Sequence, residues 1–225
     1  MPPATTTRTS NRGKYPHFYT GINMRLSGAA VPARAGLADG HPSVRREAIG
    51  VLGWLRDAAA IPSLAKLAVR DPDAQVRRAA SGALGMADAA SDARVLAALL
   101  GALRDPSWIV REEAASTLAK LKPRDALKAL LAAMTDPSWQ VRLRAARALG
   151  RIGDEDAVPA LGAALGHPIG NVRREAAIAL GEIGTPSCAP ALARAADDPD
   201  ADVRKAARLA LSRLGRDGSA QGSAG

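Results

Sequence analysis

One phrase returns along the chain at a nearly constant interval. A central copy reads Asp136-Pro137-Ser138-Trp139-Gln140-Val141-Arg142. The dipeptide Val-Arg closes each copy, with its valine at positions 44, 76, 110, 141, 172 and 203, so that successive copies lie 32, 34, 31, 31 and 31 residues apart. A fixed period of this length is typical of stacked-repeat proteins, in which each repeat contacts only its neighbours.

Each repeat is predicted to hold two helices. In residues 154–184, Ala157, Leu161 and Leu165 recur at helical spacing before a break at Gly166-His167-Pro168. A second helix is expected from near Asn171 to a C-terminal cap at Gly184. The apolar face of such a hairpin cannot be buried within the hairpin, so the next copy must cover it. A repeat is therefore helix A, a tight turn and helix B.

These features resemble the HEAT repeat, specifically its short, alanine-rich type found in phycobilisome-lyase-like proteins. The resemblance rests on the turn aspartates, the Val-Arg dipeptides and the helix-A prolines Pro32, Pro62, Pro159 and Pro190. It covers residues 28–215 and implies an all-α fold, a right-handed α-solenoid of six two-helix HEAT-like repeats. Their expected bounds are about 29–55, 58–86, 90–121, 124–152, 154–183 and 186–214.

The resemblance also implies a ladder of hydrogen bonds between neighbouring repeats. In this family the turn aspartate and the helix-B arginine form its rungs. The matching residues here are Asp39, Asp71, Asp105, Asp136 and Asp198, with Arg45, Arg77, Arg111, Arg142, Arg173 and Arg204. Repeat five carries His167 where the aspartate belongs, so we expect a weaker ladder at that point.

Both ends of the chain differ from the repeats. Residues 1–14 are basic, polar and without pattern, so we expect a disordered tail. Residues 15–27 hold Tyr15, Phe18 and Tyr19, which include the only phenylalanine and both tyrosines of the chain. This segment is either a cap over the first repeat or an arm that binds a partner. Residues 216–225 have linker composition and are expected to be flexible.

Two tryptophans occupy the same place in consecutive repeats. Trp108 and Trp139 each stand three residues after the turn aspartate, where Gly170 and Ala201 stand in later repeats. Because the fold does not require bulk at this place, the pair either packs between repeats near the rim or forms a partner-binding edge. Trp54, at the end of helix B in repeat one, is expected in the core.

The net charge of +9 is the other surface signal. Helix B lines the concave face in HEAT proteins, so a second basic residue beside the ladder arginine predicts a basic stripe there. The partner-binding candidates are Arg46, Arg78, Arg144, Arg174 and Lys205. They favour an acidic protein as partner. Nucleic acid is a less favoured partner, because glutamates interrupt the stripe.

The chain lacks the patterns of catalysis and metal binding. Its histidines, His17, His41 and His167, are far apart, and it has no Cys-x-x-Cys, phosphate loop or serine-hydrolase elbow. The His-Glu pairs of HEAT-type di-iron hydroxylases are missing too. We predict no catalytic residue, no metal and no cofactor. The single cysteine, Cys188, is expected to be a small buried residue, and the use of one cysteine indicates a reducing, cytoplasmic location. No apolar run is long enough to span a membrane, so we expect no membrane insertion.

These observations predict a non-enzymatic scaffold that binds another protein through its concave face and the Trp108/Trp139 edge. The resemblance supplies an alternative of another class, a phycobilin lyase-like subunit that handles an open-chain tetrapyrrole on a phycobiliprotein. A bilin would be bound only under that alternative, in which the basic groove would meet its propionates.

Overall fold

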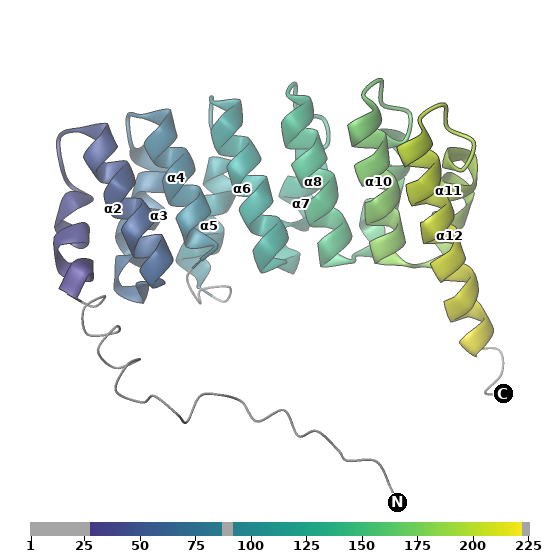
Figure 1. Ribbon diagram of the computed structural model, residues 1–225, viewed down its shortest axis with the longest axis horizontal. Coiled ribbons are helices and arrows are strands. Elements are labelled where there is room, and N and C mark those ends of the chain that lie inside the picture. The colour runs from purple at the N-terminus through teal and green to yellow at the C-terminus, as the bar shows by residue number, and fades with distance from the viewer. Residues whose placement is uncertain (1–27, 87–91, 222–225) are drawn as a thin grey trace, which may run out of the picture.

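The computed structural model describes residues 28–86 and 92–221, and every regular element in these ranges is a helix (Figure 1). The expected tail 1–14 and the aromatic segment with Tyr15, Phe18 and Tyr19 lie outside the described residues.

Helix B of the six repeats is the longer element. These helices are α2 (Pro42–Leu55), α4 (Ala74–Leu84), α6 (Trp108–Leu121), α8 (Trp139–Ile152), α10 (Gly170–Ile183) and α12 (Ala201–Gln221). Helix A covers residues 28–36 in repeat one, then α3 (Ile61–Arg70), α5 (Ala93–Ala102), α7 (Leu127–Ala133), α9 (Val158–Ala164) and α11 (Ala189–Ala195). Short 3₁₀ turns precede four of these, namely η2 (Ala58–Ala60), η3 (Arg124–Ala126), η4 (Glu155–Ala157) and η5 (Pro186–Cys188).

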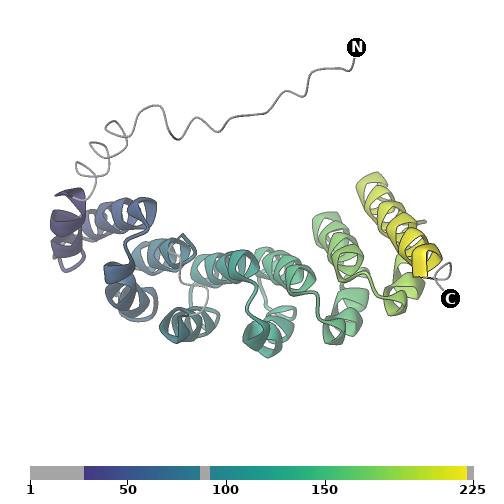
Figure 2. The same ribbon diagram turned by 90° about the horizontal axis from the view of Figure 1, so that it is seen from below.

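The helices form two layers. Each helix B packs against the helix B of the next repeat, and the A helices lie behind them in a second row (Figure 2). The row bends so that the B helices occupy its inner, concave side (Figure 2). The prediction of an all-α solenoid made of two-helix repeats is confirmed.

Small residues set the close spacing of the layers. The valine of Val-Arg is buried in repeats two to six, at Val76, Val110, Val141, Val172 and Val203. Gly150 of α8 lies so near α10 that an added Cβ would stand 2.6 Å from the Cα of Ala179. The helices therefore meet almost backbone to backbone, and alanine fills the remaining space.

The ends of helix B follow the sequence with one difference. Gly153 and Gly184 end α8 and α10 with φ of 74° and 72°, in the left-handed conformation that glycine adopts without a Cβ penalty. At the C-terminus, α12 continues through residues 216–221, where the linker-like composition led us to expect flexible chain. The helix already formed by residues 201–215 extends into this segment, because no proline stops it.

Candidate binding surfaces

Four ladder rungs join neighbouring repeats. They link Arg45 to Asp71, Arg77 to Asp105, Arg111 to Asp136 and Arg173 to Asp198. In each rung the arginine Nε donates to one carboxylate oxygen at 2.6–2.8 Å and Nη2 donates to the other at 2.8–2.9 Å. This two-pronged geometry matches the planar guanidinium to the planar carboxylate.

Each rung also organises its own turns. The Nη1 atom of Arg111 reaches back to the carbonyl oxygens of Asp105 and Pro106, at 2.8 and 3.1 Å. The carboxylate of Asp136 accepts the backbone N–H of Ser138 at 2.8 Å. In the next intact rung, the hydrogen bond from Arg173 lowers the pKa of Asp198, so this carboxylate stays ionised. These groups hold the repeats together and are not free to bind a partner.

The ladder is interrupted between repeats four and five. His167 replaces the aspartate, and its Nδ1 accepts the backbone N–H of Ile169 at 3.0 Å, so it preserves the turn. Within the described residues the side chain of Arg142 makes no hydrogen bond, and its Nε is buried. Desolvation, and secondarily the charge of Arg142, lower the pKa of His167, so the imidazole is neutral at pH 7. The expected weakening at His167 is therefore a complete loss of the rung.

The ladder residues at the two ends have partial roles. Among the described residues, Arg204 donates only to carbonyl oxygens of its own turn, those of Asp198 and Pro199, at 2.7 and 2.9 Å. Asp39 accepts the backbone N–H of His41 at 2.7 Å.

The basic stripe is largely neutralised in the middle of the array. Arg78 lies 3.5 Å from Glu113, and the Nε of Arg144 donates to Glu112 at 3.1 Å. Farther along, Arg147 binds the buried Glu175 with two hydrogen bonds, at 2.6 and 2.8 Å. Each of these ion pairs connects the B helices of successive repeats, so the charges are used within the concave face.

The other stripe residues fall into two groups. The Nε of Arg174 is buried without a hydrogen-bond partner among the described residues. Arg46 and Lys205 are exposed, near opposite ends of the array. The structure therefore places free positive charge toward the ends of the concave face instead of along its whole length.

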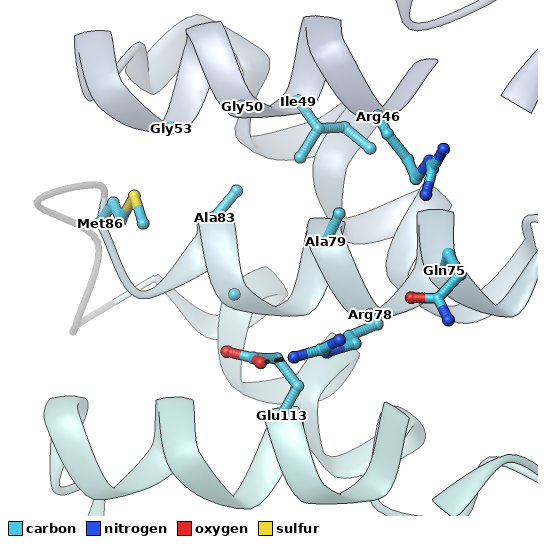
Figure 3. Close-up of a pocket in the computed structure, with 11 residues that line it drawn as sticks. Arg46, Ile49, Gly50, Gly53, Gln75, Arg78, Ala79, Ala83, Met86 and Glu113 are labelled. Carbon is cyan, nitrogen blue, oxygen red and sulfur yellow. Dashed lines mark ion pairs between the residues drawn. The ribbon is translucent and has the colours of Figure 1, made fainter. Parts of the chain in front are cut away.

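A pocket of about 360 Å³ lies between α2 and α4 at the N-terminal end of the concave face (Figure 3). Small or apolar residues form most of its lining, and Figure 3 shows Arg78 and Glu113 next to each other, with Arg46 on α2 apart from them. The lining residues are Arg46, Ile49, Gly50, Gly53, Gln75, Arg78, Ala79, Gly82, Ala83, Met86 and Glu113. Glycine at position 50 leaves space open, because an added Cβ there would meet no atom within 4 Å, whereas a Cβ on Gly82 would stand 3.0 Å from the Oε1 of Glu113.

Trp54, near the end of α2, is exposed instead of buried in the core. Its side chain is 66% exposed, so the prediction of a core tryptophan is wrong. Arg46 and Gly50 of α2 line the pocket, and Trp54 follows Gly50 at the same four-residue spacing, so it lies near them on the helix surface. Met86 holds the equivalent place in repeat two and is 48% exposed.

A pattern in the sequence marks this surface, and our sequence reasoning missed it. Nine residues after each Val-Arg arginine stand Trp54, Met86, Lys120, Arg151, Glu182 and Arg213. A place that is polar in four repeats faces solvent, so an apolar residue there marks an exposed anchor and not a core side chain.

The tryptophan pair begins two B helices. Trp108 is the first residue of α6 and is 42% exposed, and Trp139 is the first residue of α8 and is half-buried. Repeat five carries Gly170 at this place, where an added Cβ would stand 2.5 Å from the Oδ2 of Asp200 and would require that carboxylate to move. Bulk at the place is thus a property of repeats three and four alone.

Two further observations concern only residues 28–86 and 92–221. There, no three His, Cys, Asp or Glu side chains gather closely enough to hold a metal ion. In the same ranges, no helix combines the length and apolar character needed to cross a membrane. Cys188 is fully buried, as expected for a small core residue.

The fold and its surfaces define a class, an α-solenoid repeat protein whose candidate sites lie on the faces of stacked helices. The model of HEAT repeats matches residues 30–105, 69–137, 96–169 and 159–221. Together these matches cover most of the chain, and the protein belongs to the HEAT-repeat family.

Solved structures with the same architecture include natural and engineered proteins. The complex of CpcE and CpcF of phycocyanin lyase from a Nostoc species is 26% identical, with a TM-score of 0.63 over 95% of this chain and 81% of that one. A designed armadillo repeat protein in complex with the peptide (KR)4 is 20% identical, with a TM-score of 0.63 over 81% of this chain and 98% of that one. An engineered protein is 23% identical, with a TM-score of 0.62 over 83% and 96%. No curated protein sequence matches the chain significantly.

Proposed function

We propose that the protein is a non-enzymatic scaffold that binds another protein at the N-terminal end of its concave face. The observation that carries this proposal is the pocket between α2 and α4, which the exposed Met86 lines, together with the exposed Trp54 four residues after the lining residue Gly50 on α2. HEAT repeats typically bind proteins, which supports the same reading.

The chemistry of the pocket indicates the kind of partner. Tryptophan is enriched among residues that dominate binding energy, and methionine adapts to irregular apolar surfaces. Arg46 is exposed and makes no ion pair within the described residues. The partner we expect therefore presents an apolar side chain next to an acidic one. Because the helices are already ordered, little conformational entropy is lost on binding.

The edge at Trp108 and Trp139 forms the second part of this proposal. Trp108 is exposed at the start of α6, and the equivalent place in repeats two, five and six is alanine or glycine. An exposed aromatic side chain that the fold does not need is a candidate anchor. We assign it a supporting role, because the pocket between α2 and α4 offers concave shape as well.

Affinity purification from the native host tests the proposal. The wild type is compared with Trp54→Ala/Met86→Ala, with Trp108→Ala/Trp139→Ala, and with Val69→Ala as a control for loss of an exposed apolar side chain on the A-helix layer. Captured proteins are quantified by mass spectrometry, and the affinity of the main one is then measured by calorimetry.

We expect Trp54→Ala/Met86→Ala to weaken the binding of the main partner by at least about 2 kcal/mol, which is roughly thirty-fold in affinity, as for an anchor residue. The Val69 control should bind like the wild type. A partner held equally by all four proteins would refute the assignment of this surface.

The similarity to the CpcE and CpcF complex supports a second candidate, a phycobilin lyase-like subunit. Under this candidate the exposed Arg46 would bind a propionate of an open-chain tetrapyrrole, and Trp54 would stack on its rings. Co-expression with a bilin pathway separates the two candidates. A purified protein with a visible absorbance band that Trp54→Ala removes favours the lyase-like candidate, whereas a colourless protein argues for the scaffold.

A further inference from the structure

We propose that the interrupted rung between repeats four and five is a binding site for a carboxylate attached to an apolar chain. Arg142, His167 and the pocket beside them form the site. It lies at the turns of the array, and the inference does not depend on the concave-face proposal.

The first argument is the state of Arg142. The other internal rungs show what the fold provides at this place, an arginine whose Nε and Nη2 grip both oxygens of one carboxylate. Arg142 keeps the charge, but His167 offers it no carboxylate. Its buried Nε makes no hydrogen bond within the described residues. A buried donor of this kind is costly when unpaired, so a carboxylate that pairs with it is stabilised.

Among residues 28–86 and 92–221, no carboxylate forms a hydrogen bond or ion pair with Arg142. Asp136, the aspartate at the turn of repeat four, already has both oxygens bound by Arg111, at 2.7 and 2.9 Å. One of these oxygens also accepts the N–H of Ser138. The carboxylate that completes the site must therefore come from outside the described residues.

The second argument is the pocket itself. It has a volume of about 390 Å³, and Arg142 and His167 both line it. The rest of the wall is mostly apolar, with Leu131, Met134 and Val172 among its residues. A pocket of this size with one charged group and apolar walls suits a small amphipathic ligand.

The protonation of His167 favours a carboxylate over phosphate. Because Nδ1 accepts the N–H of Ile169, the neutral ring carries its proton on Nε2 and supplies a donor without a charge. The site thus offers a single positive charge, which balances a carboxylate but not a phosphate dianion. Two sources share this chemistry: a free short-chain carboxylic acid, and an acidic side chain of a partner protein.

Calorimetry on the whole chain tests the proposal with hexanoate as probe. Hexanamide tests the need for charge, and inorganic phosphate tests the choice of anion. An N-acetylated, C-amidated Leu-Glu-Leu peptide and its Leu-Gln-Leu analogue test the side-chain source. Two variants accompany the wild type: Arg142→Met, which removes the charge, and His167→Asp, which supplies the missing carboxylate within the chain.

We expect the wild type to bind hexanoate or the glutamate peptide at least ten times more tightly than hexanamide, the glutamine peptide or phosphate. Both variants should lose that binding by tenfold or more, and His167→Asp should at the same time raise the unfolding temperature. Tighter binding of the peptide assigns the site to a partner's side chain, and tighter binding of hexanoate assigns it to a free acid. The proposal is overturned if neither carboxylate saturates the wild type at tens of millimolar, or if His167→Asp binds as the wild type does.

Discussion

The ladder predicts that equivalent arginines differ sharply in their contribution to stability. Arg111 and Arg142 follow the same turn in consecutive repeats, but only Arg111 has a carboxylate partner. The informative perturbation is Arg111→Met compared with Arg142→Met. Methionine retains an apolar stem of similar length, so the two changes differ mainly in the ion pair that is lost.

The magnitude follows from burial. The side chains of Arg111 and Asp136 are 13% and 9% exposed, and they share hydrogen bonds of 2.7 and 2.9 Å. Removing one partner of a buried pair costs about 3–5 kcal/mol, and residual exposure lowers our estimate to about 2–3 kcal/mol for Arg111→Met. The free energy of unfolding of Arg142→Met should be higher than that of the wild type or at most about 0.5 kcal/mol lower, because this change removes a buried unpaired donor.

Urea unfolding followed by circular dichroism at the helix band measures both variants. The midpoint and the slope must be compared together, because a repeat array can unfold in parts and then a single free energy is not defined. Equal losses of unfolding free energy in the two variants would refute the reasoning. They would mean that the ion pair of Arg111 with Asp136 adds no stability beyond that of an unpaired arginine.

The remaining predictions concern pH and packing. Because Arg173 holds the pKa of Asp198 below the ordinary value of 3.8, the stabilisation from this pair is complete above that value and is lost as the pH falls through the lower, folded-state pKa. Between pH 6 and pH 2, the urea midpoint of the wild type should therefore fall more than that of Asp198→Asn, and parallel curves would contradict this. Gly150→Ala should lower the free energy of unfolding by about 1–3 kcal/mol, because its Cβ would overlap Ala179. Gly50→Ala, where no atom lies within 4 Å of the added Cβ, should raise it by about 0.5–1 kcal/mol, and equal effects of the two glycine changes in urea would show that close packing is not the cause.

The proposed binding surfaces depend on how the repeats differ from one another. The buried valines, the alanines and the intact ladder pairs hold neighbouring repeats together, so these positions report on stability. Trp54, Met86 and Trp108 stand at places where most other repeats carry a polar or small residue. Function in such an array is thus expected at the exceptions to the repeat.

The sequence by itself determined the architecture. The period of Val-Arg, the turn residues and the helical spacing of alanine and leucine are local signals, and six copies of a local signal leave one way to bury the apolar faces. The interruption at His167 could also be predicted from the sequence, because an exception is easily recognised within a regular repeat.

Only the tertiary structure decided which surface groups are free. The sequence predicted Arg78 and Arg144 as basic residues free to bind a partner, but glutamates of neighbouring helices pair with them. Trp54 was predicted to be a core residue because it is large and apolar, yet its side chain is exposed. These outcomes depend on contacts between residues about one repeat apart, and the angular position of a side chain between two helices is set by how the helices stack. Composition and spacing along a single chain do not carry that information.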